Sequence, residues 1–156
     1  MNTVLKANEL IFATIVFVIL PFQLSVALTI NSDLSTVDFG TVTKEYLDNG
    51  FIENNASTSD YALRLTIDDP DTLNWTINTK TSVEYFSSTF GNKPSSDFQW
   101  RINGTGIYSS ITTTDEFVLS GSGNAIVDID FKLLTDWYDV PSDYSLNVIF
   151  TITEDL

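Results

Sequence analysis

Runs of alternating apolar and polar residues constrain this chain more than any other feature. In residues 126–133, every second side chain from Val127 onward is apolar, and residues 146–153 repeat the pattern from Leu146. Side chains on a β-strand point alternately to its two faces, so each run presents one apolar face. The two runs predict half-buried strands that pair antiparallel across a long loop containing aromatic residues.

The rest of the chain after residue 27 shows the same pattern in shorter segments. Strands are expected at residues 28–30 (continuing through 37–42), 51–52, 61–68, 73–78, 83–86, 98–103, 107–111 and 117–119. Asp48-Asn49-Gly50 is a hairpin signal, and Gly121-Ser122-Gly123 is expected to end the strand before it. Because no helical period follows the leader, the sequence predicts an all-β fold, an immunoglobulin-like antiparallel sandwich, with Trp75 and Trp100 in its core.

Residues 1–27 have the composition of a secretory signal peptide. Lys6 precedes an apolar run from Leu10 to Leu20, and Ser25-Val26-Ala27 supplies the small residues of a cleavage site. An uncleaved anchor is the alternative, because the apolar run approaches the length of a membrane span if residues 22–26 are counted. We expect a signal peptide at 1–27, a single domain at 28–156, and a secreted product with no membrane segment once the leader is removed.

The charge and the missing residue types exclude several functions. The chain has a formal net charge of −14, with no Cys and no His. An acidic surface repels nucleic acid and anionic membranes. Without these two residue types there is no disulfide, thiol nucleophile or Ser-His-Asp triad. Paired carboxylates alone could hydrolyse glycosides. Because a small sandwich without an evident cleft is unsuited to this reaction, we predict that the protein is not an enzyme. No cofactor is expected.

Two groups of aspartates are the candidate metal ligands. They are Asp68, Asp69 and Asp71 in a turn, and Asp128 and Asp130 two residues apart on one strand. Carboxylate oxygens are the ligands that Ca²⁺ prefers in extracellular modules. The simpler interpretation, which we favour, is a proline-containing turn and a solvated strand face that require no ion.

Trp137 and Tyr138 lie in the loop between the two long alternating runs, among several aspartates. Aromatic side chains in the loops of a secreted sandwich can stack on sugar rings, so a non-catalytic polysaccharide-binding module is one possible function. The simpler interpretation, which we favour, is that Trp137 folds over one end of the sandwich and has a packing role.

Three short segments resemble those of secreted prokaryotic surface modules. They are Val37-Asp38-Phe39-Gly40-Thr41-Val42, Leu73-Asn74-Trp75-Thr76-Ile77 and Val140-Pro141-Ser142-Asp143-Tyr144. In these segments the chain is similar to spore coat protein U and fimbrial β-sandwiches, and to WxL cell-wall modules. The resemblance implies an immunoglobulin-like sandwich that serves surface assembly, adhesion or wall attachment.

The resemblance implies other surface proteins or further copies of this chain as partners. If the protein polymerises, the segment from Leu28 to Asp38 is the expected connector, because Leu28, Ile30 and Leu34 are spaced apolar anchors with few charges between them. Strands that add to an exposed sheet edge bind through main-chain hydrogen bonds and side-chain pockets. The alternative is an ordinary first strand packed on its own domain.

Overall fold

The structure, a computed structural model, describes residues 27–54 and 61–155. The predicted signal peptide therefore lies outside the described residues, except for Ala27. In the described part, no helix is both long enough and apolar enough to cross a membrane. The elements, in chain order, are β1 (Thr29–Ser32), α1 (Lys44–Asn49), β2 (Phe51–Asn54), β3 (Leu63–Asp68), β4 (Asn74–Thr81), β5 (Ser87–Ser88), the 3₁₀ turn η1 (Ser95–Asp97), β6 (Phe98–Ile102), β7 (Ser109–Ser110), β8 (Glu116–Ser122), β9 (Ala125–Leu134), β10 (Tyr144–Ser145) and β11 (Val148–Glu154).

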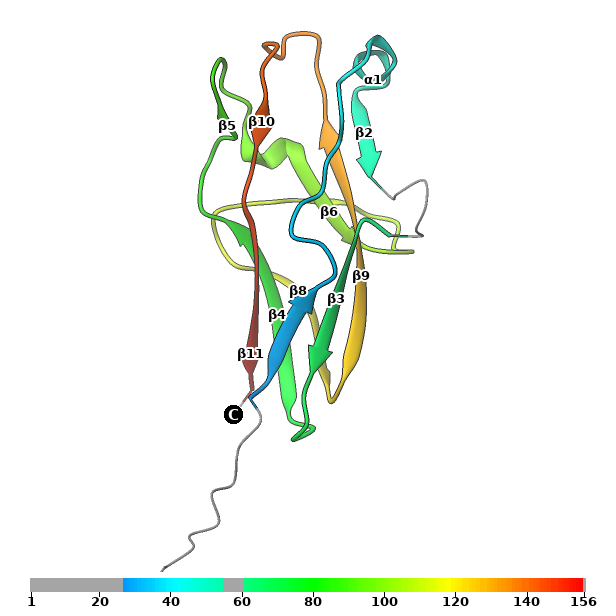
Figure 1. The fold of residues 1–156 in the computed structure, drawn as a ribbon, viewed down its shortest axis with the longest axis vertical. Coiled ribbons are helices and arrows are strands. Elements are labelled where there is room, and N and C mark those ends of the chain that lie inside the picture. Colours follow the sequence, from blue (N-terminus) through cyan, green and yellow to red (C-terminus); the bar gives the residue numbers. More distant parts are fainter. Residues whose placement is uncertain (1–26, 55–60, 156) are drawn as a thin grey trace, which may run out of the picture.

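The fold is all-β, as predicted, and its sheets are antiparallel. Sheet A has the order β1-β3-β9-β6-β7, with β2 pairing with the far half of β9 beyond β3. Sheet B has the order β11-β4-β8, and β5 and β10 form a separate two-stranded pair. Figure 1 shows the two larger sheets side by side along the long axis, with the β5–β10 pair and α1 at one end.

The core lies between sheets A and B, and the alternation in the sequence explains it. Val127, Ile129, Phe131 and Leu133 are buried on one face of β9, and Trp75 and Ile77 of β4 are buried opposite them. Each such side chain contributes about 1.5–3 kcal/mol when it is fully buried. Trp100 is also buried, so the prediction that Trp75 and Trp100 are core residues is confirmed.

The strands predicted at 61–68, 73–78, 98–103, 126–133 and 146–153 are confirmed by β3, β4, β6, β9 and β11. The predicted pairing of the last two is wrong. β9 pairs with β2, β3 and β6, whereas β11 pairs with β4 in the other sheet. Alternation specifies which face of a strand is buried but not which neighbour it pairs with, so it could not distinguish the two arrangements.

The predicted hairpin at Asp48-Asn49-Gly50 is also wrong, because residues 44–49 form α1. Gly50 adopts a left-handed conformation with a φ of 78°, and its N–H donates to the carbonyl of Tyr46. A glycine after polar residues is the usual end of a helix as well as a hairpin turn. Three residues of α1, Lys44, Glu45 and Asp48, are charged, and Lys44 and Asp48 form an i,i+4 ion pair.

Two other predicted strands are displaced or absent. Residues 37–42 form no strand, because the carboxylate of Asp38 accepts a hydrogen bond from the N–H of Gly40 and turns the chain there. Residues 83–86 contain only an isolated bridge between Tyr85 and Pro94, and the regular strand begins at Ser87.

Gly121 does not end a strand, contrary to the expectation, because β8 continues through it to Ser122. Gly121 matters for packing because it has no side chain. A Cβ atom at Gly121 would lie 2.6 Å from Cζ2 of Trp75, whose indole is buried and donates to the carbonyl of Gly123. The end of β8 therefore packs directly on this ring, and the turn that follows accepts its hydrogen bond.

Gly121→Ala is expected to lower the free energy of unfolding by about 2 kcal/mol, since overpacking a rigid buried ring forces the backbone or the ring to move. Urea denaturation followed by tryptophan fluorescence measures the change. Gly106→Ala is the control, because a Cβ there meets no atom within 4 Å. Equal stability of the two variants would contradict the proposed packing.

Candidate functional site

Asp128 and Asp130, two of the predicted calcium ligands, are bound by arginines of the neighbouring strands. Arg64 lies opposite Asp128 in the β3–β9 pairing, and its Nε and Nη2 atoms lie 2.7 and 2.8 Å from the two carboxylate oxygens. Arg101 lies opposite Asp130 in the β6–β9 pairing, with its Nε 2.9 Å from Oδ2. Both carboxylates are therefore part of cross-strand ion pairs on the outer face of sheet A.

The expectation of a solvated strand face is wrong for Asp130. This residue is only 1% exposed, and its second oxygen accepts a hydrogen bond from the side-chain amide of Asn103 at 2.9 Å. The side chain of Asp128 is 27% exposed. Hydrogen bonds from Arg64 lower the pKa of Asp128 below its ordinary value, so the stabilisation from this pair is present near neutral pH and is lost as the pH falls through the lowered pKa.

Aromatic rings cover these arginines and extend the layer over sheet A. The guanidinium carbon of Arg64 lies 4.2 Å from the ring centre of Tyr61, and that of Arg101 lies 4.3 Å from the ring centre of Tyr108. Lys132 contacts the Tyr108 ring from a further position on β9, at 4.1 Å. The attraction between a cation and the face of an aromatic ring is stabilising. These contacts therefore give the outer face of sheet A a structural role.

The other predicted calcium ligands lie in the turn between β3 and β4 and are not arranged around a common point. Asp69 is buried, its carboxylate accepts from the N–H of Gly123, and its own N–H donates to the side chain of Asn124. These bonds fasten this turn to the β8–β9 turn. Asp68 and Asp71 are exposed. Within residues 27–54 and 61–155, no cluster of three or more acidic, His or Cys side chains could hold a metal ion.

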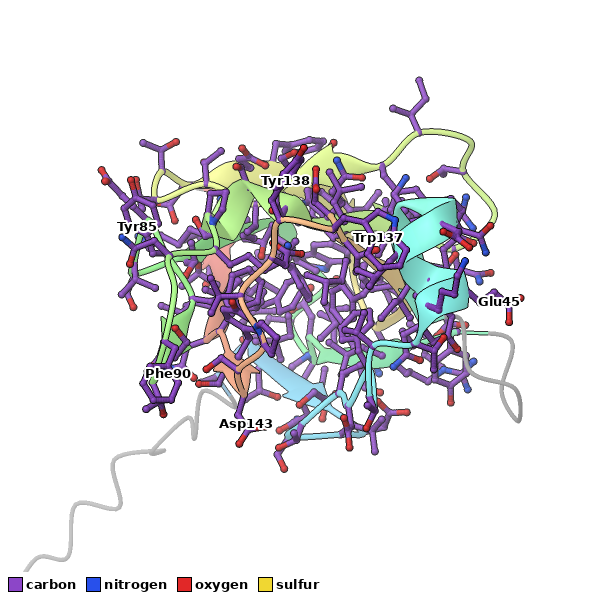
Figure 2. All side chains as sticks on the ribbon, turned by 90° about the horizontal axis from the view of Figure 1, so that it is seen from above. Glu45, Tyr85, Phe90, Trp137, Tyr138 and Asp143 are labelled. Atoms are coloured by element: carbon purple, nitrogen blue, oxygen red, sulfur yellow. The ribbon has the colours of Figure 1, made fainter. Side chains whose placement is uncertain are left out.

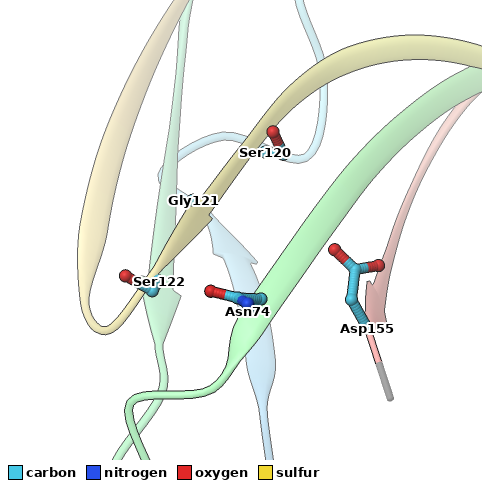
Figure 3. Close-up of a pocket in the computed structure, with 5 residues that line it drawn as sticks. All are labelled: Asn74, Ser120, Gly121, Ser122 and Asp155. Atoms are coloured by element: carbon cyan, nitrogen blue, oxygen red, sulfur yellow. The ribbon is translucent and has the colours of Figure 1, made fainter.

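A hollow of about 420 Å³ lies over β4 and β8, near the end of β11 (Figure 3). Its lining consists of Asn74, Ser120, Gly121, Ser122 and Asp155. The four side chains are exposed and polar. The N–H of Asp155 donates to the carbonyl of Asn74, which ties the end of the described chain to β4. This hollow contains none of the predicted site residues.

An open seam runs between the first and last strands, and it is the first candidate interaction surface. β1 pairs with β3 and β11 pairs with β4, and no ladder of the described strands joins β1 to β11, although the two lie near each other in Figure 1. We assign to the seam the apolar side chains of residues 28–39 and 144–152 that pack against the core but are only partly buried. They are Leu28, Ile30, Val37, Phe39, Tyr144, Leu146, Val148, Phe150 and Ile152.

The predicted strand-exchange residues at this seam differ in burial. Leu28 and Ile30 are partly buried and pack against the core, whereas Leu34 is exposed, beyond the end of β1. β1 extends over only four residues, and residues 33–43 continue without regular structure. Within the single chain, the segment is therefore an intramolecular but short and weakly buried strand.

The second candidate surface is the loop end, which we define as residues 82–97 and 135–147 together with α1. The two loops are joined by the β5–β10 pair, in which Tyr144 lies opposite Ser88. Gly91 packs so closely that a Cβ atom on it would lie 2.9 Å from Cβ of Val140. The ring of Tyr144 meets that of Phe86 edge-on, with centres 6.1 Å apart. The loops are thus packed against each other.

Lys93 is a buried ionic link between the same two loops. It is 3% exposed, and its Nζ lies 3.0 Å from Oδ2 of Asp97 and 2.7 Å from Oδ2 of Asp139. The same oxygen of Asp139 accepts from the N–H of Asp136, and Oδ1 of Asp136 accepts from the N–H of Tyr138. A chain of polar contacts therefore runs from Lys93 to the turn that carries Trp137 and Tyr138.

Large aromatic side chains are exposed on this end. Trp137 is 58% and Tyr138 is 92% exposed, and Tyr85 and Phe90 of the other loop are each more than half exposed. Figure 2 shows the four spread around the end, with Glu45 and Asp143 at its margins. Trp137 lies near Lys44 of α1, whose Nζ is 5.7 Å from its ring centre. Trp137 therefore lies on the end of the sandwich, partly exposed and next to α1.

Sequence reasoning missed Lys93, Arg64 and Arg101. Arg64 and Arg101 occupy the polar phase of predicted strands, as Asp128 and Asp130 do, so a search for opposite charges on neighbouring strands could have found the pairs. Lys93 lies in a loop between Asn92 and Pro94. No local pattern there indicates burial.

Comparisons with known proteins add no family to this description. No family model matches the sequence, and neither curated proteins nor solved structures include a match to the chain.

Proposed function

We propose that this protein is a secreted structural and adhesive module of the cell surface, an immunoglobulin-like sandwich that assembles by strand exchange. The observation that carries the proposal is the open seam between β1 and β11. The resemblance of three segments to fimbrial and coat-protein sandwiches supports the same function, and the leader-like residues 1–27 support export.

The free edge of β11 is suited to accept a strand. One of its edges pairs with β4, and no strand of the described chain pairs with the other. Its sequence, Val148-Ile149-Phe150-Thr151-Ile152-Thr153-Glu154, contains one charge and no proline. Natural sheet edges are usually protected by charges, prolines or bulges. An edge that lacks these features through most of its length favours addition of another strand.

The donor is residues 28–38 of a second copy, which take the place of β1 beside β3 and reach the edge of β11. Exchange of an identical element keeps the contacts of Leu28 and Ile30, so it costs little free energy. Leu34 is exposed in the single chain. Where the donated segment also extends along the free edge of β11, which β1 does not pair with in the single chain, Leu34 becomes a further apolar anchor in the seam.

Deletion of residues 28–35 from the exported protein is expected to abolish oligomers and to leave the monomer folded. Light scattering and electron microscopy measure assembly, and circular dichroism measures the fold. Loss of the monomer fold would show that the strand is needed within its own chain, and a wild-type protein that stays monomeric at high concentration would contradict assembly.

A point substitution separates the same alternatives without shortening the chain. Leu34→Asp is expected to raise the protein concentration needed for assembly at least tenfold. Monomer stability should change little, because this side chain is exposed in the monomer. Leu73→Asp is the matched control, since Leu73 is comparably exposed but lies outside the seam. Equal effects of the two substitutions on assembly would overturn the assignment of the donor.

A further inference from the structure

We infer that the loop end is a binding site for an uncharged polysaccharide of glucose-type rings, with Trp137 and Tyr138 as the principal stacking surfaces. This site goes beyond the assembly role proposed above and is independent of it. The seam and the loop end involve different side chains, apart from Tyr144 and Leu146, which border both.

The exposure of these aromatic rings is not explained by the stability of the fold. Burying large aromatic side chains is among the strongest stabilising contributions available to a domain. Trp137 and Tyr138 nevertheless remain mostly exposed, although the loops that carry them are fixed by the β5–β10 pair and by the Lys93 ion pairs. Uncovered rings on loops whose backbone is held in place are available for contact with a ligand, and prior fixation of the loops reduces the entropy lost on binding.

The surroundings of the rings favour a sugar over a protein partner. The core of a protein interface is a continuous apolar region from which charged residues are depleted. Here Tyr85, Phe90, Trp137 and Tyr138 are spread around the end, and Glu45 and Asp143 lie at its margins (Figure 2). Asp136 is also exposed, directly before Trp137. Separate rings with one carboxylate beside them and others at the margins match a ligand that has apolar faces and hydroxyl donors at its edges.

Chemistry narrows the ligand further. A pyranose ring whose substituents are all equatorial has C–H groups on both faces, so it lies flat on an indole or phenol ring. Its hydroxyl groups then point outward, where carboxylates accept their hydrogen bonds. Several rings on one end favour a polymer over a single sugar. The net charge of −14 opposes polymers that carry carboxylates or sulfates.

Native affinity electrophoresis of the exported protein in gels containing mixed-linked β-glucan tests the proposal. The wild type is expected to be retarded. The double variant Trp137→Ala, Tyr138→Ala is expected to need at least tenfold more glucan for the same retardation. Phe117→Ala is the matched control, because Phe117 is an aromatic residue on β8, outside the loop end, whose exposed fraction of 62% is close to that of Trp137. This variant should be retarded like the wild type.

Other polymers complete the test. A galactan, whose rings carry an axial hydroxyl, and an anionic alginate are expected to retard the protein little. No retardation by the glucan, or retardation that persists in the double variant, would overturn the site. Stronger retardation by alginate than by glucan would overturn the ligand class. None of these outcomes depends on assembly, because the Leu34→Asp variant can be run in the same gels.

Discussion

Asp130→Ala is expected to lower the free energy of unfolding by about 3 kcal/mol, which is the usual effect of removing one partner of a buried ion pair. The substitution leaves the guanidinium of Arg101 without its carboxylate and the side-chain amide of Asn103 without the acceptor it has on Asp130. Urea denaturation of the purified protein measures the change. Circular dichroism before denaturation establishes that the variant folds.

Asp128→Ala is the matched control for this experiment. Asp128 lies on the same strand and also binds an arginine, but it is half-buried and its partner Arg64 is more exposed. Exposed pairs contribute roughly 0–1 kcal/mol, so a loss of less than about 1 kcal/mol is expected. Similar losses in the two variants would show that burial does not determine the strength of these cross-strand pairs.

Lys93→Ala is expected to lower the free energy of unfolding by about 3 kcal/mol, because it removes the buried cation shared by two carboxylates. Without the ammonium group, the carboxylates of Asp97 and Asp139 lose the cation between them and repel each other. The loops of residues 82–97 and 135–147 also lose their ionic link. Thermal unfolding and urea denaturation both report the loss.

Lys80→Ala is the control for Lys93, because Lys80 pairs with Asp115 on the surface of sheet B, where both side chains are partly exposed. Its expected cost is less than about 1 kcal/mol. If the Lys93 variant were as stable as the Lys80 variant, the loops would be held by the β5–β10 pair and its packing alone.

The parts of the fold that were predictable are those in which one strand face is buried. In β9 and β3 the alternation of side chains is set by burial on the core side, so the sequence pattern records it directly. α1 is too short to show a helical period, and the residues at its end, Asp48 and Asn49 followed by the cap Gly50, suit a hairpin as well as a helix end. The local sequence alone therefore left two structures open.

The candidate sites were predictable to different extents. The exposure of Trp137 and Tyr138 was predictable from their place in a loop, because strand burial does not account for aromatic residues there. The role of Asp130 was not found, since it depends on Arg101, 29 positions earlier in the chain. Pairing between distant strands decides whether a carboxylate is solvated or bound, and single-strand periodicity contains no information on that pairing.

The adjacency of β1 and β11 has a mechanical consequence. Thr29 begins β1 opposite Asp68, and Glu154 ends β11 opposite Trp75, at the same end of the molecule (Figure 1). A force that pulls these two strand ends apart acts on one backbone hydrogen bond at a time and peels each strand from its sheet. In the assembly proposed above, a force transmitted through an exchanged strand would act along the whole ladder at once and would have to break its bonds together. The module would then resist force better where it links one copy to the next than when it is stretched between its own ends.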